Sequence, residues 1–376
     1  MDYNDSPDEA RFRADLRRFL AETVPQFPAP TTVEERKQTR QRWHQALHAA
    51  GYVGVSIPAR FGGHGMAPVY EAILNEEVGR SRGPELPRAT GYLARALALY
   101  GTAEQREAYL DGFISGRALW CQGFSEPDAG SDLASLRTTA ISDGDAYVLN
   151  GQKVWNGGAD YADYCFLLCR TDPGAEKHSG LSVLLIDMKT PGVLARPIRK
   201  ISGRPDFAEI FFTDARVSAS SRLGAEGQGW EIAMSTLSYE RGPSDAGFIA
   251  KYQSLLEDVD AAFRNGRLRS FPGASRQLAR AHVIVEALLR HVQRSLSARD
   301  PEVPPGPEAS IDKLLMTKTE QELLHIITEL TGSHAWLDDD DLQNNYVWSR
   351  AASIYGGAEQ IQRTIVAQRV LGLPRK

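Results

Sequence analysis

The sequence predicts an α+β protein in which a β domain stands between two helical segments of the chain. Two observations support this prediction. Apolar residues recur at helical spacing before about residue 120 and after about residue 226, and short β-prone runs bounded by turn residues lie between them. A doubly wound sheet would instead alternate strands with helices. The 376 residues suit two or three packed units, and we expect three domains at 1–120, 121–225 and 226–376.

The first segment is predicted to be helical. Two sets of apolar residues repeat every three or four positions, namely Phe12, Leu16, Phe19 and Leu20, then Trp43, Leu47 and Ala50. Gly51 is expected to end the second of these helices. The stretch 61–65, Phe-Gly-Gly-His-Gly, is interpreted as a structural turn. A phosphate-binding loop is the alternative, but the strand-then-helix setting of a dinucleotide fingerprint is missing.

The middle segment has the composition of a compact β domain. The turn dipeptides Asp143-Gly144 and Asn150-Gly151 flank Ala-Tyr-Val-Leu, which we interpret as a hairpin strand. The runs Ser182–Ile186 and Glu209–Thr213 are short, β-prone and bounded by Gly, Pro and Asp. These features predict several short strands rather than helices.

The last segment is predicted to be helical again. One apolar face marks a long helix and consists of Leu278, Ala281, Val285, Leu288, Val292 and Leu296. Prolines between 301 and 307 force an extended connection, and a further helix is expected from near Ser310 to Gly332. The four acids at 338–341 are interpreted as a solvated loop. A final helix should end at Gly372.

Composition excludes several classes of function. The formal net charge is -5 and no basic stripe is visible, so a nucleic-acid partner is not expected. No run approaches the roughly 20 apolar residues that span a bilayer, and the acidic N-terminus does not resemble a signal peptide. Cys121, Cys165 and Cys169 are interpreted as buried apolar residues rather than metal ligands or disulfide partners. We therefore expect a cytoplasmic protein without a metal site.

Two motifs are more informative than the rest of the chain. Residues 120–138 pass from an apolar segment into a turn rich in Pro, Gly, Ser and Asp, and Asn150-Gly-Gln-Lys-Val-Trp155 follows. At this spacing the pair resembles the flavin-binding signature of the acyl-CoA dehydrogenases. Further stretches resemble the same family in the same order, at Gly180–Met188, Pro191–Val193, Gly229–Trp230, Glu240–Arg241, Ile354–Arg363 and Leu371–Arg375.

The resemblance implies a fold and an activity. The family has an N-terminal helical domain, a central β-barrel-like domain that binds flavin, and a C-terminal four-helix bundle that carries the oligomer interface. Its members bind FAD and oxidise an acyl-CoA thioester to the trans-2-enoyl thioester. A carboxylate removes the α-proton, and the β-hydrogen leaves as hydride to flavin N5. Fixed donors must stabilise the enolate charge that develops on the thioester oxygen.

The same resemblance assigns cofactor contacts to individual residues. The Ser125 hydroxyl and the backbone at Gln122 and Phe124 are expected to contact the flavin ring. At Gly130 and Ser131, a turn of exposed N–H groups is expected to approach the pyrophosphate.

Three further cofactor contacts follow from the resemblance. Trp155 is expected to pack beside the isoalloxazine ring, although a core tryptophan is the ordinary alternative for this residue type. Gly157 stands where the family has Thr or Ser, so only its backbone N–H can donate. Gln360, in the C-terminal stretch, is expected to contact the cofactor as well.

The catalytic base requires a choice between two positions. The commonest family pattern at the C-terminus is Tyr-Glu-Gly-Thr, whose Glu is the base, but this chain has Tyr-Gly-Gly-Ala at 355–358. A second branch, with isovaleryl- and long-chain-type enzymes, places the base on the first long C-terminal helix, directly before an Arg. Glu240 precedes Arg241 here, so we interpret Glu240 as the base and expect the Gly356 N–H to donate to the thioester oxygen. The alternative is that Glu240 is a helix-surface charge or an ion-pair partner of a nearby Arg.

The substrate and the partners follow from the same comparison. The adjacent Gly356 and Gly357 leave room for a branched or ring-bearing acyl group. Residues 306–310, Gly-Pro-Glu-Ala-Ser, resemble a bacterial branch that includes steroid side-chain enzymes and often lacks Arg-x-x-Phe-Gly, which has no match between 250 and 300 here. We expect a homodimer, a homotetramer or a heterotetramer with a paralogue, and electron-transferring flavoprotein as acceptor. An oxidase, an enzyme of carrier-protein thioesters, or a non-catalytic subunit of a heteromer are the alternatives.

Overall fold

A computed structural model describes residues 4–30, 32–86, 88–203, 206–239, 244–297, 306–333 and 340–374. The chain forms two compact units, each built from separate stretches of sequence. The first contains Met1–Pro28, Ala67–Leu86 and Arg241–Lys376, and the second contains Ala29–Met66 and Pro87–Glu240. The predicted N-terminal segment is therefore shared between the two units.

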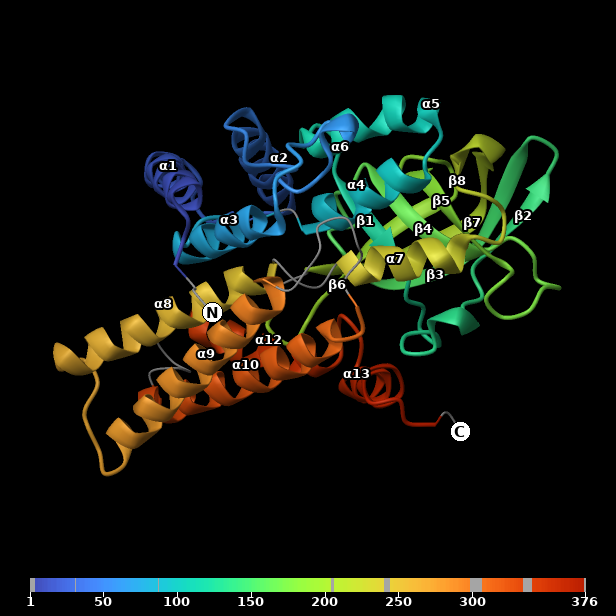
Figure 1. Ribbon diagram of the computed structural model, residues 1–376. Coiled ribbons are helices and arrows are strands. Elements are labelled where there is room, and N and C mark those ends of the chain that lie inside the picture. Colours follow the sequence, from blue (N-terminus) through green and yellow to red (C-terminus); the bar gives the residue numbers. More distant parts are fainter. Residues whose placement is uncertain are drawn as a thin grey trace. The chain divides into compact units, whose positions relative to one another are not determined.

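The first unit is helical (Figure 1). Its main helices are α1 (Pro7–Thr23), α3 (Pro68–Arg80), α8 (Ser244–Arg264), α9 (Ala274–Ser297), α10 (Ala309–Thr331), α12 (Asp340–Ser349) and α13 (Glu359–Ile365). The short 3-10 helices Val24–Gln26 and Arg350–Ser353 and the π-helical turn Val366–Val370 extend α1, α12 and α13. One apolar cluster from α8, α9 and α10 forms the core, to which Ala281, Val285 and Leu288 contribute the predicted face of α9.

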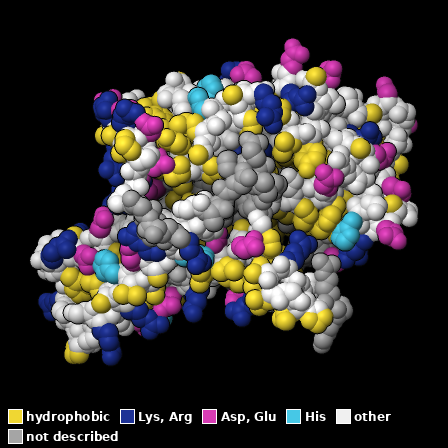
Figure 2. Space-filling model, in the orientation of Figure 1, with side chains coloured by type: hydrophobic (Ala, Val, Ile, Leu, Met, Phe, Trp, Pro, Cys, Tyr) yellow, Lys and Arg dark blue, Asp and Glu magenta, His cyan; other side chains and the backbone are white. Residues whose placement is uncertain are grey.

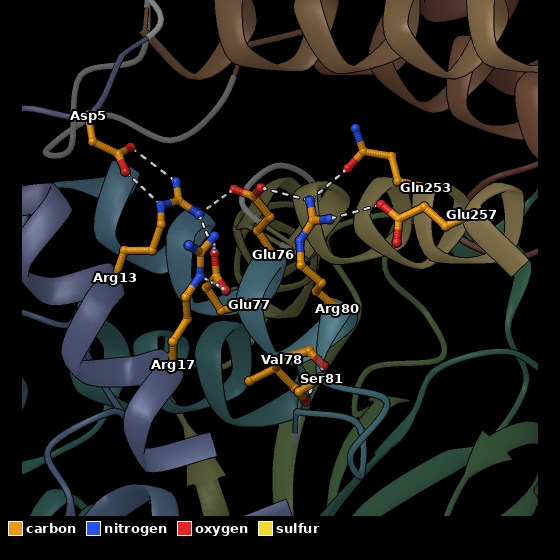
Figure 3. A network of polar contacts seen from close by, with 10 residues as sticks. All are labelled: Asp5, Arg13, Arg17, Glu76, Glu77, Val78, Arg80, Ser81, Gln253 and Glu257. Carbon is orange, nitrogen blue, oxygen red and sulfur yellow. Dashed lines mark hydrogen bonds and ion pairs between the residues drawn. The ribbon is translucent and has the colours of Figure 1, made fainter. Parts of the chain in front are cut away.

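Close backbone contact and a buried ion network join α1, α3 and α8. A Cβ added at Gly79 of α3 would lie 2.3 Å from the carbonyl oxygen of Gly247 in α8, so only glycine permits this approach. Figure 3 shows Glu77 accepting from Arg13 at 2.6 Å and from Arg17 at 2.7 Å. Burial raises the pKa of Glu77, but the two arginines outweigh this effect, and the pKa lies below its ordinary value.

The second unit is built on one mixed sheet. In the described residues its strands are β1 (Trp120–Gly123), β2 (Thr139–Asp143), β3 (Ala146–Gly157), β4 (Tyr164–Arg170), β5 (Leu181–Asp187), β6 (Val193–Ile198), β7 (Phe207–Ser218) and β8 (Arg222–Leu223). The strand order is β6-β7-β3-β2-β4-β5-β8, and β1 pairs with β4 in parallel. The three cysteines are buried in or beside this sheet, as predicted, and burial raises the pKa of the Cys169 thiol to about 12.

The hairpin prediction is half right. Asp143-Gly144 is a turn, since β2 ends at Asp143 and β3 begins at Ala146. Asn150-Gly151 is instead inside β3, at a bulge in the pairing with β7. The Asn150 amide exchanges two 3.0 Å hydrogen bonds with Asp214 of β7, which keeps the strand paired where a turn was expected.

The second unit also contains helices. They are α2 (Val33–Ala49), α4 (Arg88–Tyr100), α7 (Gly229–Tyr239) and the continuous helical stretch made of α5 (Ala103–Gln105), the π-helical turn Arg106–Leu110 and α6 (Asp111–Ile114). Short 3-10 helices lie at Ala59–Phe61, Leu133–Ser135 and Ala219–Ser221. In Figure 1, α7 crosses one face of the sheet, where it contacts β4, β5 and α4.

Two loop predictions have different outcomes. The glycine-rich stretch at 61–65 packs on its own chain, because a Cβ at Gly63 would lie 2.2 Å from the Ile57 carbonyl oxygen, and this contact supports a structural turn. Of the acidic run, Asp338 and Asp339 lie outside the described residues, whereas Asp340 and Asp341 begin α12 rather than a loop. Carboxylates at a helix N-terminus are favoured by the helix dipole, which explains the difference.

The surface shown in Figure 2 carries basic and acidic side chains interspersed with each other and with apolar ones. No described group of three or more His, Cys, Asp or Glu side chains is arranged to hold a metal ion. None of the helices seen in the described ranges has the length and apolarity required to cross a membrane.

Candidate functional site

The two predicted flavin motifs meet in the second unit. The chain leaves β1 through Phe124 and Ser125 and runs beside β3, where the Val154 N–H donates to the Ser125 carbonyl oxygen at 2.9 Å. Phe124 is buried and Ser125 is half-buried. The Ser125 side chain makes no hydrogen bond to any residue within the described ranges. Its hydroxyl is therefore available to a ligand.

A buried ion pair fixes this junction, and sequence analysis did not identify it. Lys153 of β3 is 0% exposed and Glu126 is 8% exposed. The Lys153 Nζ donates to Glu126 Oε1 at 2.8 Å and to the Phe124 carbonyl oxygen at 2.9 Å. Glu126 also accepts from the backbone N–H groups of Arg137 and Thr138, at 2.7 and 2.9 Å. The pair thus joins β3, the end of β1 and the start of β2.

Burial affects the two charges of this pair differently. Desolvation raises the pKa of Glu126, but Lys153 and the N–H donors outweigh it, so that the pKa lies below its ordinary value. Desolvation lowers the pKa of Lys153, and Glu126 offsets only part of this effect. Both groups are hydrogen-bonded, as buried charges must be.

Trp155 stands out from the sheet on a strained backbone. Its φ is 63°, a left-handed value that is costly for an aromatic residue. It lies at the bulge where the pairing of β3 with β7 shifts between Lys153 and Asn156. The indole is 59% exposed, and its edge contacts Phe207 with ring centroids 6.1 Å apart. The core interpretation of Trp155 is therefore wrong, and the exposed ring offers a flat apolar face.

The glycines of the motifs fit a group that comes close to the backbone. A Cβ added at Gly130 or at Gly157 would meet no atom of the chain within 4 Å, so the protein's own packing explains neither glycine. Gly130 and Ser131 are exposed in the turn after Glu126. An available hydroxyl, an exposed indole and an uncrowded backbone together suit a planar ring system with an anionic tail, which is the chemistry of a flavin nucleotide.

Gly356 and Gln360 belong to the first unit, whereas the other described candidate residues belong to the second. Gly356 and Gly357 have φ values of 64° and 95°. The buried Gln362 side chain donates to both of their carbonyl oxygens at 3.3 Å. Gln360, in the first turn of α13, is exposed. Gln362 was missed because nothing in its sequence neighbourhood marks a side chain that supports a turn.

The proposed base, Glu240, lies outside the described residues, as does Arg241. The helix before it, α7, ends at Tyr239. The guanidinium of Arg95 in α4 lies over the Tyr239 ring, 4.5 Å from its centroid. Sequence analysis did not single out Arg95 either.

Three family profiles match the chain in sequence order. They are described as the N-terminal, middle and C-terminal domains of acyl-CoA dehydrogenase, and they match residues 6–117, 121–215 and 227–371. Among curated proteins, the chain is similar to acyl-CoA dehydrogenase IpdE1 of Mycobacterium tuberculosis. The two are 37% identical over 98% of this chain and 99% of the relative.

Solved structures agree with the sequence comparison. The chain is similar to a protein described as the Tcur3481-Tcur3483 steroid ACAD, with a TM-score of 0.89 and 28% identity over 100% of both chains. It is also similar to a chain of the ChsE4-ChsE5 complex from Mycobacterium tuberculosis, with a TM-score of 0.87 and 28% identity, again over 100% of both chains.

Proposed function

This chain belongs to the acyl-CoA dehydrogenase family of flavoprotein oxidoreductases, and from that premise we propose that it uses FAD to introduce an α,β double bond into a ring-bearing or branched acyl-CoA, with Glu240 as base. The observation that carries the proposal is the junction of Ser125 with Val154, which brings an available hydroxyl beside the exposed Trp155. FAD, when bound, supplies the acceptor for the β-hydride.

We assign the remaining contributions to the chain's own groups. Ser125 and the backbone at Gln122 and Phe124 hold the flavin ring, Trp155 covers it, and N–H groups at 130–131 face the pyrophosphate. In the first unit, the Gly356 N–H donates to the thioester oxygen and Gln360 contacts the cofactor. The donor to the thioester oxygen stabilises the charge that develops as the α-proton leaves. The buried Gln362 supports the Gly356 turn and thereby orients that donor.

The assignment of Glu240 as the base rests on the residue types at two positions, 356 and 240. Gly356 has no side chain, and its φ of 64° is a conformation that a Glu rarely adopts. Glu240 follows directly on α7 in sequence and supplies the missing carboxylate. A base in water-excluded surroundings next to a flavin should have a raised pKa, which matches it to an acidic carbon.

Glu240→Gln tests the assignment. The variant keeps the shape of the side chain but cannot accept a proton, so the rate of flavin reduction by an acyl-CoA should fall by about 10²–10⁴-fold. The measurement is anaerobic stopped-flow absorbance of the yellow protein. Glu231→Gln, at an exposed position on α7, is the matched control, and its flavin should be reduced at the wild-type rate. Near-normal reduction in Glu240→Gln would exclude Glu240 as the base.

The substrate and the partner are proposed on the same basis. The adjacent glycines at 356 and 357 leave space beside the thioester, and one similar protein is described as a steroid ACAD. We therefore favour a bulky, ring-bearing acyl group over a short straight chain. Another similar structure is described as a complex of two differently named chains, ChsE4 and ChsE5. A heteromer with a second family member is accordingly the favoured assembly, with electron-transferring flavoprotein as the electron acceptor.

A further inference from the structure

The helix α13 in the first unit buries a polar side chain and leaves its apolar ones half-buried. Among the residues of α13, all of them described, only Gln362 is buried, and it is 0% exposed, whereas Ile361 and Ile365 are half-buried. The Gln362 Nε2 donates to the Gly356 and Gly357 carbonyl oxygens at 3.3 Å each. Its buried Oε1 has no hydrogen-bond donor within the described ranges. An unpaired buried oxygen costs about 1–3 kcal/mol, so stability alone does not explain this amide.

The two hydrogen bonds fix the orientation of the amide and of the turn that it holds. A flipped amide would place Oε1 against two carbonyl oxygens, which would repel it, so Nε2 must face the turn. Gly356 and Gly357 have φ values of 64° and 95°, which glycine adopts far more readily than other residues. Gln362 therefore holds a glycine turn by binding both of its carbonyl groups.

The N–H group of Gly357 faces away from Gln362. No peptide bond in the described part of the chain is cis, and in a trans peptide the N–H and C=O groups point in opposite directions. The Gly357 N–H shares its peptide plane with the Gly356 carbonyl group, which Gln362 binds. This N–H is therefore directed to the far side of the turn. It follows directly on the Gly356 N–H, the proposed donor to the thioester oxygen.

Both N–H groups are available to a ligand. Neither donates to an oxygen atom of any residue that the structure describes, and both glycines are half-buried. Successive N–H groups of a turn form a concave site for an anionic oxygen. The oxygen of a thioester acquires this charge only while the α-proton leaves, so donors fixed in advance act at that moment.

We propose that the Gly357 N–H is a second catalytic donor to the thioester oxygen, beside the Gly356 N–H, and that Gln362 is the positioning residue for this pair. This inference rests on the proposed function, because it takes the Gly356 turn as the place of the thioester. The α-carbon–hydrogen bond breaks, its proton passes to Glu240, and its electron pair delocalises onto the thioester oxygen, which the two N–H groups stabilise. The second donor therefore acts mainly on kcat and little on KM.

A backbone substitution tests the Gly357 donor directly. Residues 1–350 are ligated to a synthetic segment 351–376 that carries Ala351→Cys for the ligation and Gly357→glycolic acid, and the product is refolded with FAD. The resulting ester lacks the N–H but has no new side chain. Anaerobic flavin reduction by an acyl-CoA should be about 10²–10³-fold slower than in the ligated chain that retains Gly357. Gly372→glycolic acid, at an exposed glycine with a φ of 68°, is the matched control and should leave the rate unchanged.

A second readout separates charge stabilisation from turnover. A 3-thiaacyl-CoA has sulfur in place of the β-carbon, so it can lose its α-proton but cannot pass on a β-hydride. Its anion is detected by long-wavelength absorbance with the bound flavin, and the pH midpoint of this band gives the pKa of the α-carbon. Gly357→glycolic acid should raise that pKa by about 2, in line with the loss of one donor. The affinity for the corresponding thioether, which has no carbonyl oxygen, should not change.

Variants of Gln362 test the positioning role. Gln362→Met should lower kcat by about tenfold or more at every pH, with little change in KM. In Gln362→Glu, the buried carboxyl group can donate to the turn only when protonated, and burial raises its pKa. Its kcat, expressed per bound flavin, should therefore be restored in part at low pH and fall as the pH rises, relative to the wild type. Gln368→Met, at a half-buried position nearby, should retain the wild-type kcat.

The possible failures can be told apart. A reference rate and an unchanged α-carbon pKa in Gly357→glycolic acid would overturn the inference, while reduction of the wild-type flavin by octanoyl-CoA would still support the proposed function. Should the ester fail to bind FAD, Gln362→Glu decides, because a pH profile parallel to the wild type would also overturn the inference. If no acyl-CoA reduced the wild-type flavin, the proposed function itself would be wrong, and this inference with it.

Discussion

Lys153 is a buried residue that supports the candidate site and is not one of its proposed ligand contacts. Its ammonium group is fully buried and is held by one carboxylate and one carbonyl oxygen, both next to Ser125 in the chain. Removing one member of a buried pair leaves the other charge unpaired in a low-dielectric environment. The pair therefore determines where Ser125 and Trp155 stand relative to each other.

We expect Lys153→Met to lower the free energy of unfolding by about 3–5 kcal/mol, because Glu126 stays buried without its cation. The double variant Lys153→Met/Glu126→Gln removes both charges and should recover much of this loss. Urea unfolding followed by circular dichroism gives the free energies, and fluorescence titration of the flavin-free protein gives its affinity for FAD. The exposed pair of Arg216 with Asp143 provides a control, since Arg216→Met should change neither quantity. Additive effects of the two substitutions would show that the pair is not coupled.

The sequence motifs suggested candidate members of the site but not the surroundings of those residues. The motif positions at 122–131 and 155–157 could be named because an acidic, glycine-rich turn and a following tryptophan occur at a recognisable spacing. The exposure of Trp155 could not be read from sequence, since it depends on a bulge set by pairing with β7, a strand some 50 residues away. Lys153 and Glu126 lie inside the same motifs, but their burial is a property of the assembled sheet.

At the level of elements, α2 is held to the end of α6 by a histidine that must stay neutral. The Nε2 of His44 donates to the Ile114 carbonyl oxygen at 2.9 Å, and its buried Nδ1 has no partner among the described residues. Burial lowers the pKa of His44 to about 4; the hydrogen bond to Ile114 opposes this shift, and nearby His48 and Arg40 reinforce it. The folded chain therefore binds a proton at this site less readily than the unfolded chain, whose pKa is near 6.5.

This difference in the pKa of His44 predicts that the folded protein loses stability in acid. The stability that neutral His44 provides is complete above pH 6.5 and is lost as the pH falls from 6.5 toward 4. At pH 5 the loss should be about 2 kcal/mol, at roughly 1.4 kcal/mol per pKa unit. His44→Gln, which keeps a donor for Ile114 but cannot titrate, should lose about 2 kcal/mol less than the wild type between pH 7.5 and 5 in urea unfolding. His178→Gln, at an exposed position, is the control, and a His44→Gln curve parallel to the wild type would disprove the role of His44.

The elements themselves were predictable where local periodicity decides them. The apolar face at 278–296 predicted α9, and the β-prone runs predicted β5 and the centre of β7. The prediction of a turn at Asn150-Gly151 was wrong because the hydrogen bonds between Asn150 and Asp214 outweigh the turn preference of this dipeptide. The prediction of a loop at Asp340 and Asp341 was wrong because acidic residues are favoured both in solvated loops and at helix N-termini. Each error occurs where tertiary pairing or a cap outweighs composition.

At the scale of the whole molecule, the two units combine distant stretches of sequence, and the predicted partner adds a second chain. Because the Arg-x-x-Phe-Gly motif is missing, we expect the chain to co-purify with a second family member and to carry about one flavin for two polypeptides. Native mass spectrometry with an absorbance-based flavin count would measure both quantities. A homo-oligomer with one flavin on every chain would contradict the heteromer and favour the homotetramer.

The strained, outward-facing Trp155 has a cost when nothing covers it. The Trp155 ring packs against Phe207 only at its edge, so the flavin-free protein exposes an apolar surface on a strained backbone. Newly made chains would then be vulnerable to aggregation until the prosthetic group arrives, so that flavin supply during synthesis governs the yield of usable enzyme.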